Sequence, residues 1–331
     1  MLRSSHFRNA TFIAIVASFA LAACSKGVTP PPKIDDGEPA PAPQAAPAPP
    51  PKPANAKSFM IGELSAVALR DGYLEFPNDN KIFGVGHTPE EVNALLAPAG
   101  LPTDKLQLSL QPLLVTMKDH VLLFDTGAGG SFGPTSGHIA DGFTEAGVDP
   151  KNVTDIFISH VHGDHVGGLV NADGALNFPN ATIHISKPEW KFLTTVSMDI
   201  AKQLGLGNRD AMVAAMKPKV DAFAPGSQIV QGTVKAVDIK GHTPGHSGYL
   251  ITSGPESLLY VGDSVHHYVI SVQKPDWPMA FDSDQTIGAK SRAALIADSA
   301  AKGQRIFAVH FPFPGIGKFE KQGDGYVWVG E

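Results

Sequence analysis

The sequence has very little cysteine and little charge. Cys24 is the only cysteine among 331 residues, so no intramolecular disulfide can form and thiol catalysis is excluded from the rest of the chain. Charged residues make up 18% of the chain, the formal net charge is −6, and there is no long run of Lys or Arg. A nucleic-acid-binding surface is therefore not expected. The 43% of hydrophobic residues is enough for a sizeable core.

The amino-terminal residues 1–23 are typical of a signal peptide. Arg3 and Arg8 precede the apolar run 11–23, which is too short for a comfortable membrane span. The run ends in Leu-Ala-Ala-Cys24, which resembles the lipobox of bacterial lipoproteins. That resemblance implies cleavage before Cys24, lipidation of Cys24 and, because Ser25 follows, anchoring at the outer membrane of a bacterial cell envelope. The alternative is an ordinary signal peptide cleaved after a small residue.

Residues 24–57 form a candidate tether between this anchor and a folded domain. Eleven of the chain's 28 prolines lie there, and large apolar side chains are almost absent. Such a segment cannot bury enough surface to fold, and it favours an extended polyproline conformation. From residue 58 the composition is that of a globular protein, and we expect one domain over 58–331.

Strand-like and helix-like patterns interleave along this domain. Because strands outnumber helices and several are joined by short turns, we expect an α/β fold in which two sheets pack together between helices, an αββα four-layer sandwich. The expected helices are 188–205 and 291–303. The expected strands are 105–117, 120–125, 154–159, 181–186, 228–239, 247–252, 257–262 and 305–310.

The stretch "SHVHGDHVGG" (159–168) concentrates metal-ligand residue types after one expected strand. His160 and His162 are two residues apart, so in extended chain they point the same way and can share one ion. Gly163 lets the chain turn, and Asp164 and His165 can then face a second point nearby. Histidine nitrogen and carboxylate oxygen are ligands that suit Zn²⁺.

Six positions cannot complete two coordination spheres, so other strand ends must supply ligands. Three expected strands are each followed by such residues, in "GHTPGH" (241–246), "GDSVHH" (262–267) and "VHFPF" (309–313). The candidates are His242 or His246, between which spacing does not choose, together with Asp263 and His310. His266 and His267 are better explained as pocket wall or surface, and His6, His87, His120, His138 and His184 are given no role.

The order of these motifs resembles the metallo-β-lactamase fold superfamily over residues 100–315. "LLFDTGAGG" (122–130) matches that superfamily's early Asp-Thr-Gly element. The sequence around the motifs is most similar to that of the methyl parathion hydrolase and lactonase branch. The resemblance implies that His160, His162 and His242 hold one metal ion, and that Asp164, His165 and His310 hold another. It also implies that Asp263 bridges the two ions, and that Asp125 and His246 orient the ligands from behind.

The resemblance further implies a mechanism and a substrate class. Two divalent ions, expected to be Zn²⁺, would activate a bridging hydroxide that cleaves neutral esters, namely lactones or aryl esters and also phosphotriesters such as organophosphates. Asp164 and Asp263 are the expected catalytic carboxylates, and the branch's aromatic pocket suggests Phe132, Trp190 and Phe313 as walls. Expected partners are a small-molecule ester, the membrane through Cys24, and a second copy of the chain as a candidate homodimer. The alternatives are a β-lactamase of the same fold and a non-catalytic tethered binding module.

Overall fold

A computed structural model describes residues 54–331, so the predicted signal peptide, Cys24 and most of the tether lie outside the described residues. The first strand begins at Ala56, two residues before the predicted start of the domain. Between residues 54 and 331, no helix is both long and apolar enough to cross a bilayer.

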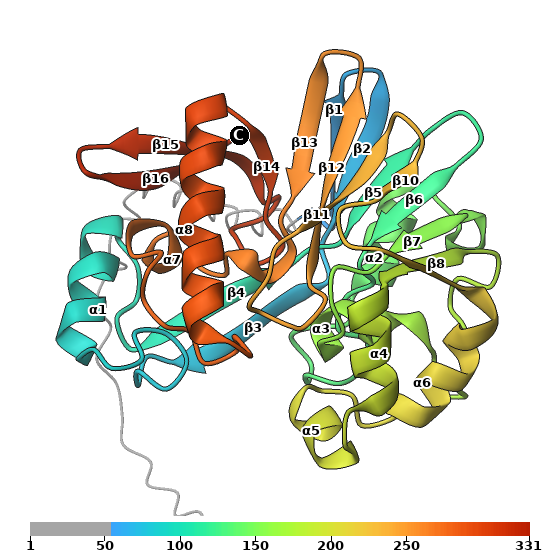
Figure 1. Cartoon of the computed structure of the whole chain (residues 1–331), viewed down its shortest axis with the longest axis horizontal. Coiled ribbons are helices and arrows are strands. Elements are labelled where there is room, and N and C mark those ends of the chain that lie inside the picture. Colours follow the sequence, from blue (N-terminus) through green and yellow to red (C-terminus); the bar gives the residue numbers. More distant parts are fainter. Residues whose placement is uncertain (1–53) are drawn as a thin grey trace, which may run out of the picture. The chain divides into compact units, whose positions relative to one another are not determined.

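Two seven-stranded sheets form the centre of the fold (Figure 1). Both mix parallel and antiparallel pairs, and β6, β7 and β8 run parallel, which brings their carboxyl ends to one edge. The first sheet has the order β1 (Ala56–Ile61), β2 (Leu64–Leu69), β5 (Leu113–Thr116), β6 (Val121–Phe124), β7 (Asp155–Phe157), β8 (Thr182–Ser186) and β9 (Val220–Phe223). The second has the order β10 (Gln228–Val230), β11 (Val234–Asp238), β12 (Ser247–Ser253), β13 (Glu256–Tyr260), β14 (Arg305–Phe307), β15 (Ile316–Gln322) and β16 (Gly325–Gly330).

Helices cover the outer face of each sheet, as the four-layer prediction requires. The first sheet packs against α2 (Ile139–Ala146), α3 (Gly163–Val166), α4 (Lys187–Thr195), α5 (Met198–Gln203) and α6 (Arg209–Met216). The second packs against α7 (Ile270–Gln273) and α8 (Gln285–Lys302), which lies on the left of Figure 1. Aromatic side chains such as Phe124, Phe157, Tyr249 and Tyr260 fill the space between the sheets. The αββα prediction is therefore confirmed.

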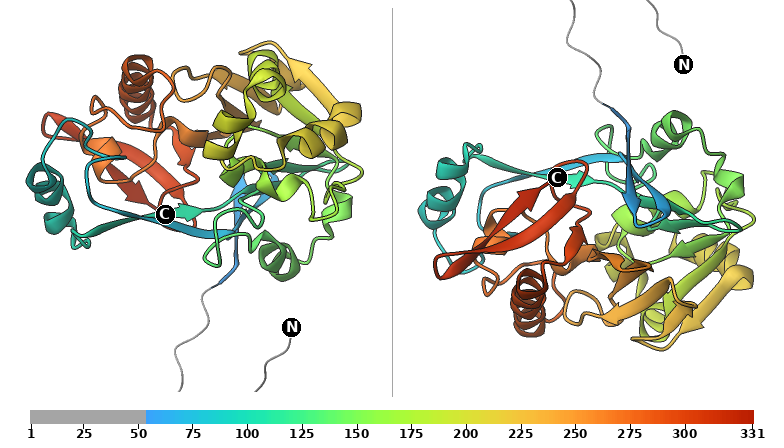
Figure 2. Two further views of the ribbon diagram at one scale, coloured as in Figure 1. Left: turned by 90° about the horizontal axis from the view of Figure 1, so that it is seen from below. Right: turned by 90° about the horizontal axis from the view of Figure 1, so that it is seen from above.

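A separate two-stranded pair, β3 (Gly72–Pro77) with β4 (Lys105–Leu110), runs toward α1 (Pro89–Leu96) in both views of Figure 2. Side chains alternate along the pair, as in any strand. Leu74, Phe76 and Leu108 point to the hollow beside the candidate site, whereas Tyr73 and Glu75 point to a neighbouring hollow. The pair therefore supplies an apolar wall beside the site.

Three sequence predictions about elements need correction. The run 228–239 is not one strand but two, β10 and β11, which pair antiparallel across a turn at 231–233. The run 105–117 is not one strand, because the chain leaves β4 at Leu110 and enters the first sheet only at Leu113, with Pro112 between. The helix predicted over 188–205 is two helices, since Ser197 caps a new helix by accepting a hydrogen bond from the Ile200 N–H. The second expected helix, 291–303, begins earlier at Gln285 as α8.

Candidate metal centre

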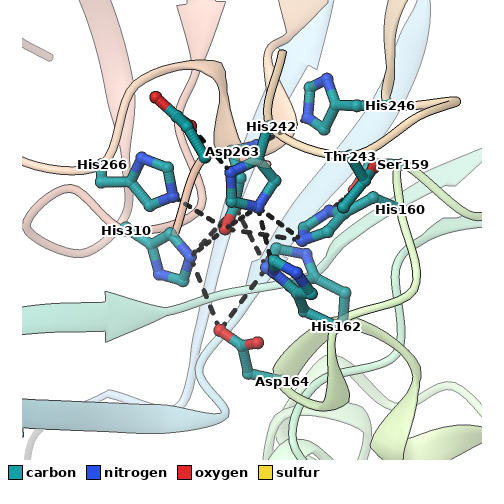
Figure 3. Close-up of polar contacts among 12 residues, drawn as sticks. Ser159, His160, His162, Asp164, His242, Thr243, His246, Asp263, His266 and His310 are labelled. Atoms are coloured by element: carbon teal, nitrogen blue, oxygen red, sulfur yellow. Dashed lines mark hydrogen bonds and ion pairs between the residues drawn. The ribbon is translucent and has the colours of Figure 1, made fainter. Parts of the chain in front are cut away.

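The candidate ligands all follow or precede strands at one end of the two sheets. His160 and His162 lie just beyond β7, and Gly163 opens the short helix α3 that carries Asp164 and His165. From the second sheet, His242 precedes β12, Asp263 lies in the turn after β13, and His310 follows β14 (Figure 3). Residues 150 positions apart in sequence therefore meet, as the sequence predicts.

The first cluster consists of His160, His162, His242 and Asp263, with one ligand atom of each within 4.8 Å of the others. His242 Nε2 lies 3.1 Å from His160 Nε2 and 3.0 Å from His162 Nδ1. Asp263 Oδ2 lies 3.4 Å from His242 Nε2 and 3.6 Å from His160 Nε2. These spacings suit atoms that each lie about 2.0–2.2 Å from a common tetrahedral Zn²⁺.

The second cluster consists of Asp164, His165, Asp263 and His310, again within 4.8 Å. Asp263 contributes its other oxygen, because Oδ1 lies 3.0 Å from both His165 Nε2 and His310 Nε2. Asp164 Oδ2 lies 3.5 Å from His165 Nε2 and 3.6 Å from His310 Nε2. One carboxylate is thus shared by two adjacent sets of ligand atoms.

The donor atoms in these clusters fit a metal pair better than a hydrogen-bonded network. His165 Nε2 and Asp263 Oδ1 are buried, face each other and make no hydrogen bond within the described residues. Buried polar atoms without partners cost free energy, and a bound cation removes that cost. The His and Asp donor set suits a pair of divalent ions of the zinc type.

The electrostatics of the two clusters point the same way. Burial lowers the pKa of His160 and of His242 well below the ordinary value, so both rings are neutral and able to ligate at neutral pH. Burial also lowers the pKa of His165, but the charges of Asp263, Asp164 and Asp125 outweigh it and hold that pKa well above the ordinary value. The carboxylates around His165 therefore favour a positive charge at this position, and a bound cation can supply that charge in place of the ring proton.

Asp125 lies behind the ligands, where the sequence predicted an orienting role. Its Oδ2 atom is 2.7 Å from His165 Nδ1 and accepts hydrogen bonds from the hydroxyls of Ser159 at 2.6 Å and Tyr260 at 2.7 Å. Its Oδ1 accepts from the Ser159 backbone N–H at 2.7 Å. Asp125 has a φ of 56°, a costly conformation for a residue other than glycine.

The structure separates His242 from His246, between which spacing alone did not choose. His242 belongs to the first cluster, whereas His246 belongs to neither. His246 Nδ1 lies 3.0 Å from the Ile239 carbonyl oxygen, and its Nε2 accepts a hydrogen bond from the Asp263 N–H at 2.9 Å. His246 therefore holds the backbone of the shared carboxylate.

Asp282 and Arg292 were not predicted to lie at the site, and His266, predicted as pocket wall or surface, lines the hollow over the clusters. Asp282 Oδ1 lies 3.1 Å from His242 Nδ1, and the buried Arg292 donates to Asp282 at 3.2 Å. His266, expected to be wall or surface, is 0% exposed, and its Nε2 lies 3.1 Å from Asp263 Oδ2. Neither ring nitrogen of His266 makes a hydrogen bond within the described residues. No motif marks Asp282 in the sequence, whereas His266 stands three positions after Asp263.

A hollow of about 220 Å³ opens over both clusters. Of the three predicted wall aromatics, only Phe132 lines it; Trp190 packs against the hydrophobic core beneath the first sheet, and Phe313 lines the neighbouring hollow. No lysine or arginine is among the residues that line the hollow, which are Leu74, Phe76, Leu108, Phe132, His162, Asp164, Gln203, Leu204, Asp263, His266, Phe281 and His310. The site is thus apolar-walled with acidic and imidazole groups at its floor.

Comparisons with known proteins agree with this geometry. The sequence model of the Metallo-beta-lactamase superfamily matches residues 113–310. The structure is similar to that of AidC, a dizinc quorum-quenching lactonase in complex with a product, with 30% identity, a TM-score of 0.78, and coverage of 84% of this chain and 97% of that chain. It is also similar to the hydrolase AbOPH of the β-lactamase superfamily, with 28% identity, a TM-score of 0.77, and coverage of 85% and 99%.

More distant structures share the fold alone. An N-acyl homoserine lactone lactonase has 19% identity and a TM-score of 0.53, with coverage of 78% of this chain and 100% of that chain. Among curated proteins, no sequence matches this chain.

Proposed function

The chain belongs to the metallo-β-lactamase superfamily and is a metal-dependent hydrolase, and from that premise we propose that it is a lactonase-type esterase. Its proposed substrates are neutral esters, namely lactones or aryl esters, with phosphotriesters as side substrates. The observation that carries the proposal is the sharing of Asp263 by two ligand clusters beneath a hollow that no lysine or arginine of residues 54–331 lines.

The proposed ligand sets follow the two clusters. His160, His162 and His242 would hold one Zn²⁺, Asp164, His165 and His310 the other, and Asp263 both. When bound, such an ion pair lowers the pKa of a water molecule toward neutrality and polarises the carbonyl or phosphoryl oxygen of a substrate.

The protein's own residues would bind and orient the ester. Leu74, Phe76, Phe132 and Phe281 offer an apolar wall for the uncharged part of the substrate, and they exclude water from it. Burial raises the pKa of Asp164, but the charge and hydrogen bond of His165 and the charge of His310 bring it to about 2. Asp164 is therefore ionised at neutral pH and can accept a hydrogen bond at the mouth of the site.

His266 is the group best placed to donate a hydrogen bond to the substrate. It lines the hollow, its Nε2 lies 3.1 Å from Asp263 Oδ2, and neither ring nitrogen makes a hydrogen bond within the described residues. An imidazole N–H aimed at a developing oxyanion or at a leaving oxygen stabilises the transition state more than the ground state.

A substrate panel tests the proposal against a β-lactamase of the same fold. β-Lactam antibiotics carry a carboxylate, for which the residues lining the hollow offer no lysine or arginine partner. Protein of measured metal content should therefore hydrolyse lactones or aryl esters at least about 100-fold faster, in kcat/KM, than β-lactams, the ratio that a difference of roughly 3 kcal/mol produces. Turnover of β-lactams alone would contradict the proposal, and no turnover by metal-loaded protein would favour the tethered binding module.

We also propose that Cys24 carries a lipid anchor to the bacterial outer membrane, since the sequence before it resembles a lipobox. Two acyl chains are enough to hold a protein on a bilayer. The Cys24→Ser variant should move from the membrane fraction to the soluble fraction after cell lysis, with its esterase activity per mole unchanged. A variant that stayed in the membrane fraction would refute the anchor.

A further inference from the structure

Glu189 is a buried carboxylate that touches neither metal cluster and yet joins the loops that carry the first one. It lies in the first turn of α4, and its side chain is fully buried. No lysine, arginine or histidine within the described residues forms an ion pair with it. The three hydrogen bonds that its side chain accepts within the described residues come from two loops far apart in sequence.

The first of these loops carries His160 and His162. The backbone N–H of Val161, the residue between the two histidines, donates to Glu189 Oε1 at 2.9 Å. This bond fixes the peptide plane that joins His160 to Val161. It therefore helps to set the directions in which the side chains of His160 and His162 leave the backbone.

The second loop carries His242. The Thr243 hydroxyl donates to Glu189 Oε2 at 2.9 Å, and the Gly245 backbone N–H donates to the same oxygen at 2.8 Å. Ser186, which caps α4, donates from its hydroxyl to the Gly245 carbonyl oxygen at 2.6 Å. A Cβ at position 245 would collide with the Glu189 nitrogen and the Ser186 hydroxyl, so the loop lies directly on the helix start.

A buried carboxylate without a cationic partner is costly. Burial raises the pKa of Glu189 to about 7, against the opposing effect of its hydrogen bonds from Val161, Thr243 and Gly245. No apolar side chain could replace it, because two buried backbone N–H groups would then lose their acceptor.

We propose that Glu189 is a positioning residue that fastens the His160–His162 loop to the His242 loop and thereby sets the positions of the three histidines that belong only to the first metal cluster. The histidines of the second cluster are held by other groups: Asp125 contacts His165, and the Ser109 carbonyl oxygen lies 2.9 Å from His310 Nδ1. The inference rests on the metal assignment of the proposed function, and it adds that one residue outside both clusters controls the histidines of only one of them.

The test is the Glu189→Gln variant, which keeps the shape of the side chain. Its amide group must replace one of the two acceptor oxygens, so at least one backbone N–H loses its acceptor. The affinity of each cluster for Zn²⁺ is measured by competition with a chelator, in a His310→Ala background that leaves the first cluster complete and in a His162→Ala background that leaves the second. The Co²⁺-substituted proteins supply absorption spectra that report the ligand geometry.

Glu189→Gln should weaken Zn²⁺ binding about 10- to 100-fold in the His310→Ala background, as is typical when a residue that supports metal ligands is replaced. In the His162→Ala background the change should stay within about threefold, and only the Co²⁺ spectrum of the first cluster should change. Thr243→Val removes one donor and leaves both backbone bonds, so it should have a smaller effect in the same direction. Glu91→Gln makes the same chemical change at an exposed helix start and should have no effect.

Equal losses in both backgrounds, or none in either, would overturn the inference. Thermal unfolding of the metal-free proteins accompanies these measurements, and a variant that does not fold is replaced by Thr243→Val, for which the same selective loss is required. If the wild-type protein binds no metal ion at either cluster, the proposed function fails and the inference fails with it. If the wild type binds two ions and Glu189→Gln binds them equally well, only the inference fails.

Discussion

Two groups of histidine and aspartate lie at opposite ends of the same short strand, β7, and they differ in how their polar atoms are paired. Beyond the end of β7, the two metal clusters bring imidazole nitrogens within 3.0–3.1 Å of one another. They leave His165 Nε2 and Asp263 Oδ1 without hydrogen bonds in the part of the chain that the structure describes. At the start of β7, His120, Asp155, His184 and Asp221 form a chain.

In that chain each contact joins a histidine to a carboxylate. Asp155 Oδ2 lies 2.8 Å from His120 Nδ1 and accepts from the Thr154 hydroxyl at 2.7 Å, while its Oδ1 lies 2.8 Å from His184 Nε2. His184 Nδ1 lies 3.1 Å from Asp221 Oδ2. The comparison teaches that residue types alone do not define a metal site; convergence of ligand atoms that lack other partners does.

We expect Asp263→Asn to have the largest effect on metal binding and turnover, because it changes the carboxylate that both clusters share. The amide cannot offer two anionic oxygens, so both clusters should bind Zn²⁺ more weakly, and kcat/KM for the best ester should fall about 1,000-fold or more, because the ions supply several kcal/mol of transition-state stabilisation. Metal analysis and steady-state kinetics measure both quantities. Wild-type turnover by this variant would show that the shared carboxylate is not needed.

His162→Ala should have a smaller effect, because it leaves the second cluster complete. We expect loss of one of two bound ions per chain and at least about a 100-fold loss of turnover, while circular dichroism remains that of the wild type. Retention of two ions and of wild-type rates would show that the first cluster is assigned to the wrong residues.

Asp155→Asn should change stability and leave catalysis alone. Burial raises the pKa of Asp155, but hydrogen bonds from His184, Thr154 and His120 outweigh burial and lower the pKa to about 2. Because the folded pKa lies below the unfolded value, the ionised group stabilises the fold above about pH 4, and this stabilisation is lost as the pH falls toward 2.

The free energy of unfolding of the Asp155→Asn variant at pH 7 should therefore be lower than that of the wild type by about 1–2 kcal/mol. This value allows for the screening of the Asp155 charge by nearby solvent. The difference from the wild type should shrink between pH 4 and pH 2, and kcat/KM should stay within about twofold. Urea titrations at several pH values measure the first effect. A loss of bound metal in this variant would show that the His120–Asp155–His184 chain contributes to the metal clusters, contrary to the account.

Much of the site could be predicted from the sequence because its ligands stand in short motifs at the ends of strands. The seven residues from His160 to His310 come together, since strand ends on one edge of paired sheets are close in space even when they are distant in sequence. The role of Asp125 came from the resemblance to the superfamily, and the structure places Asp125 after β6, the neighbour of β7.

The supporting carboxylates could not be predicted in this way. Asp282 and Glu189 come from a loop before α8 and from the first turn of α4, and acidic residues in such places are common without any role in a site. Which apolar residues face the hollow also depends on packing. The helix α4 turns Trp190 toward the hydrophobic core, and the β3–β4 pair, which the sequence did not predict, supplies Leu74, Phe76 and Leu108.

The most direct test of the shared-carboxylate site is diffraction from zinc-loaded crystals at the zinc absorption edge. We predict two anomalous peaks about 3.5–4 Å apart. One should lie among His160, His162 and His242, the other among Asp164, His165 and His310, with Asp263 contacting both. A single peak, or peaks only at the His120–Asp155–His184 chain, would contradict the account.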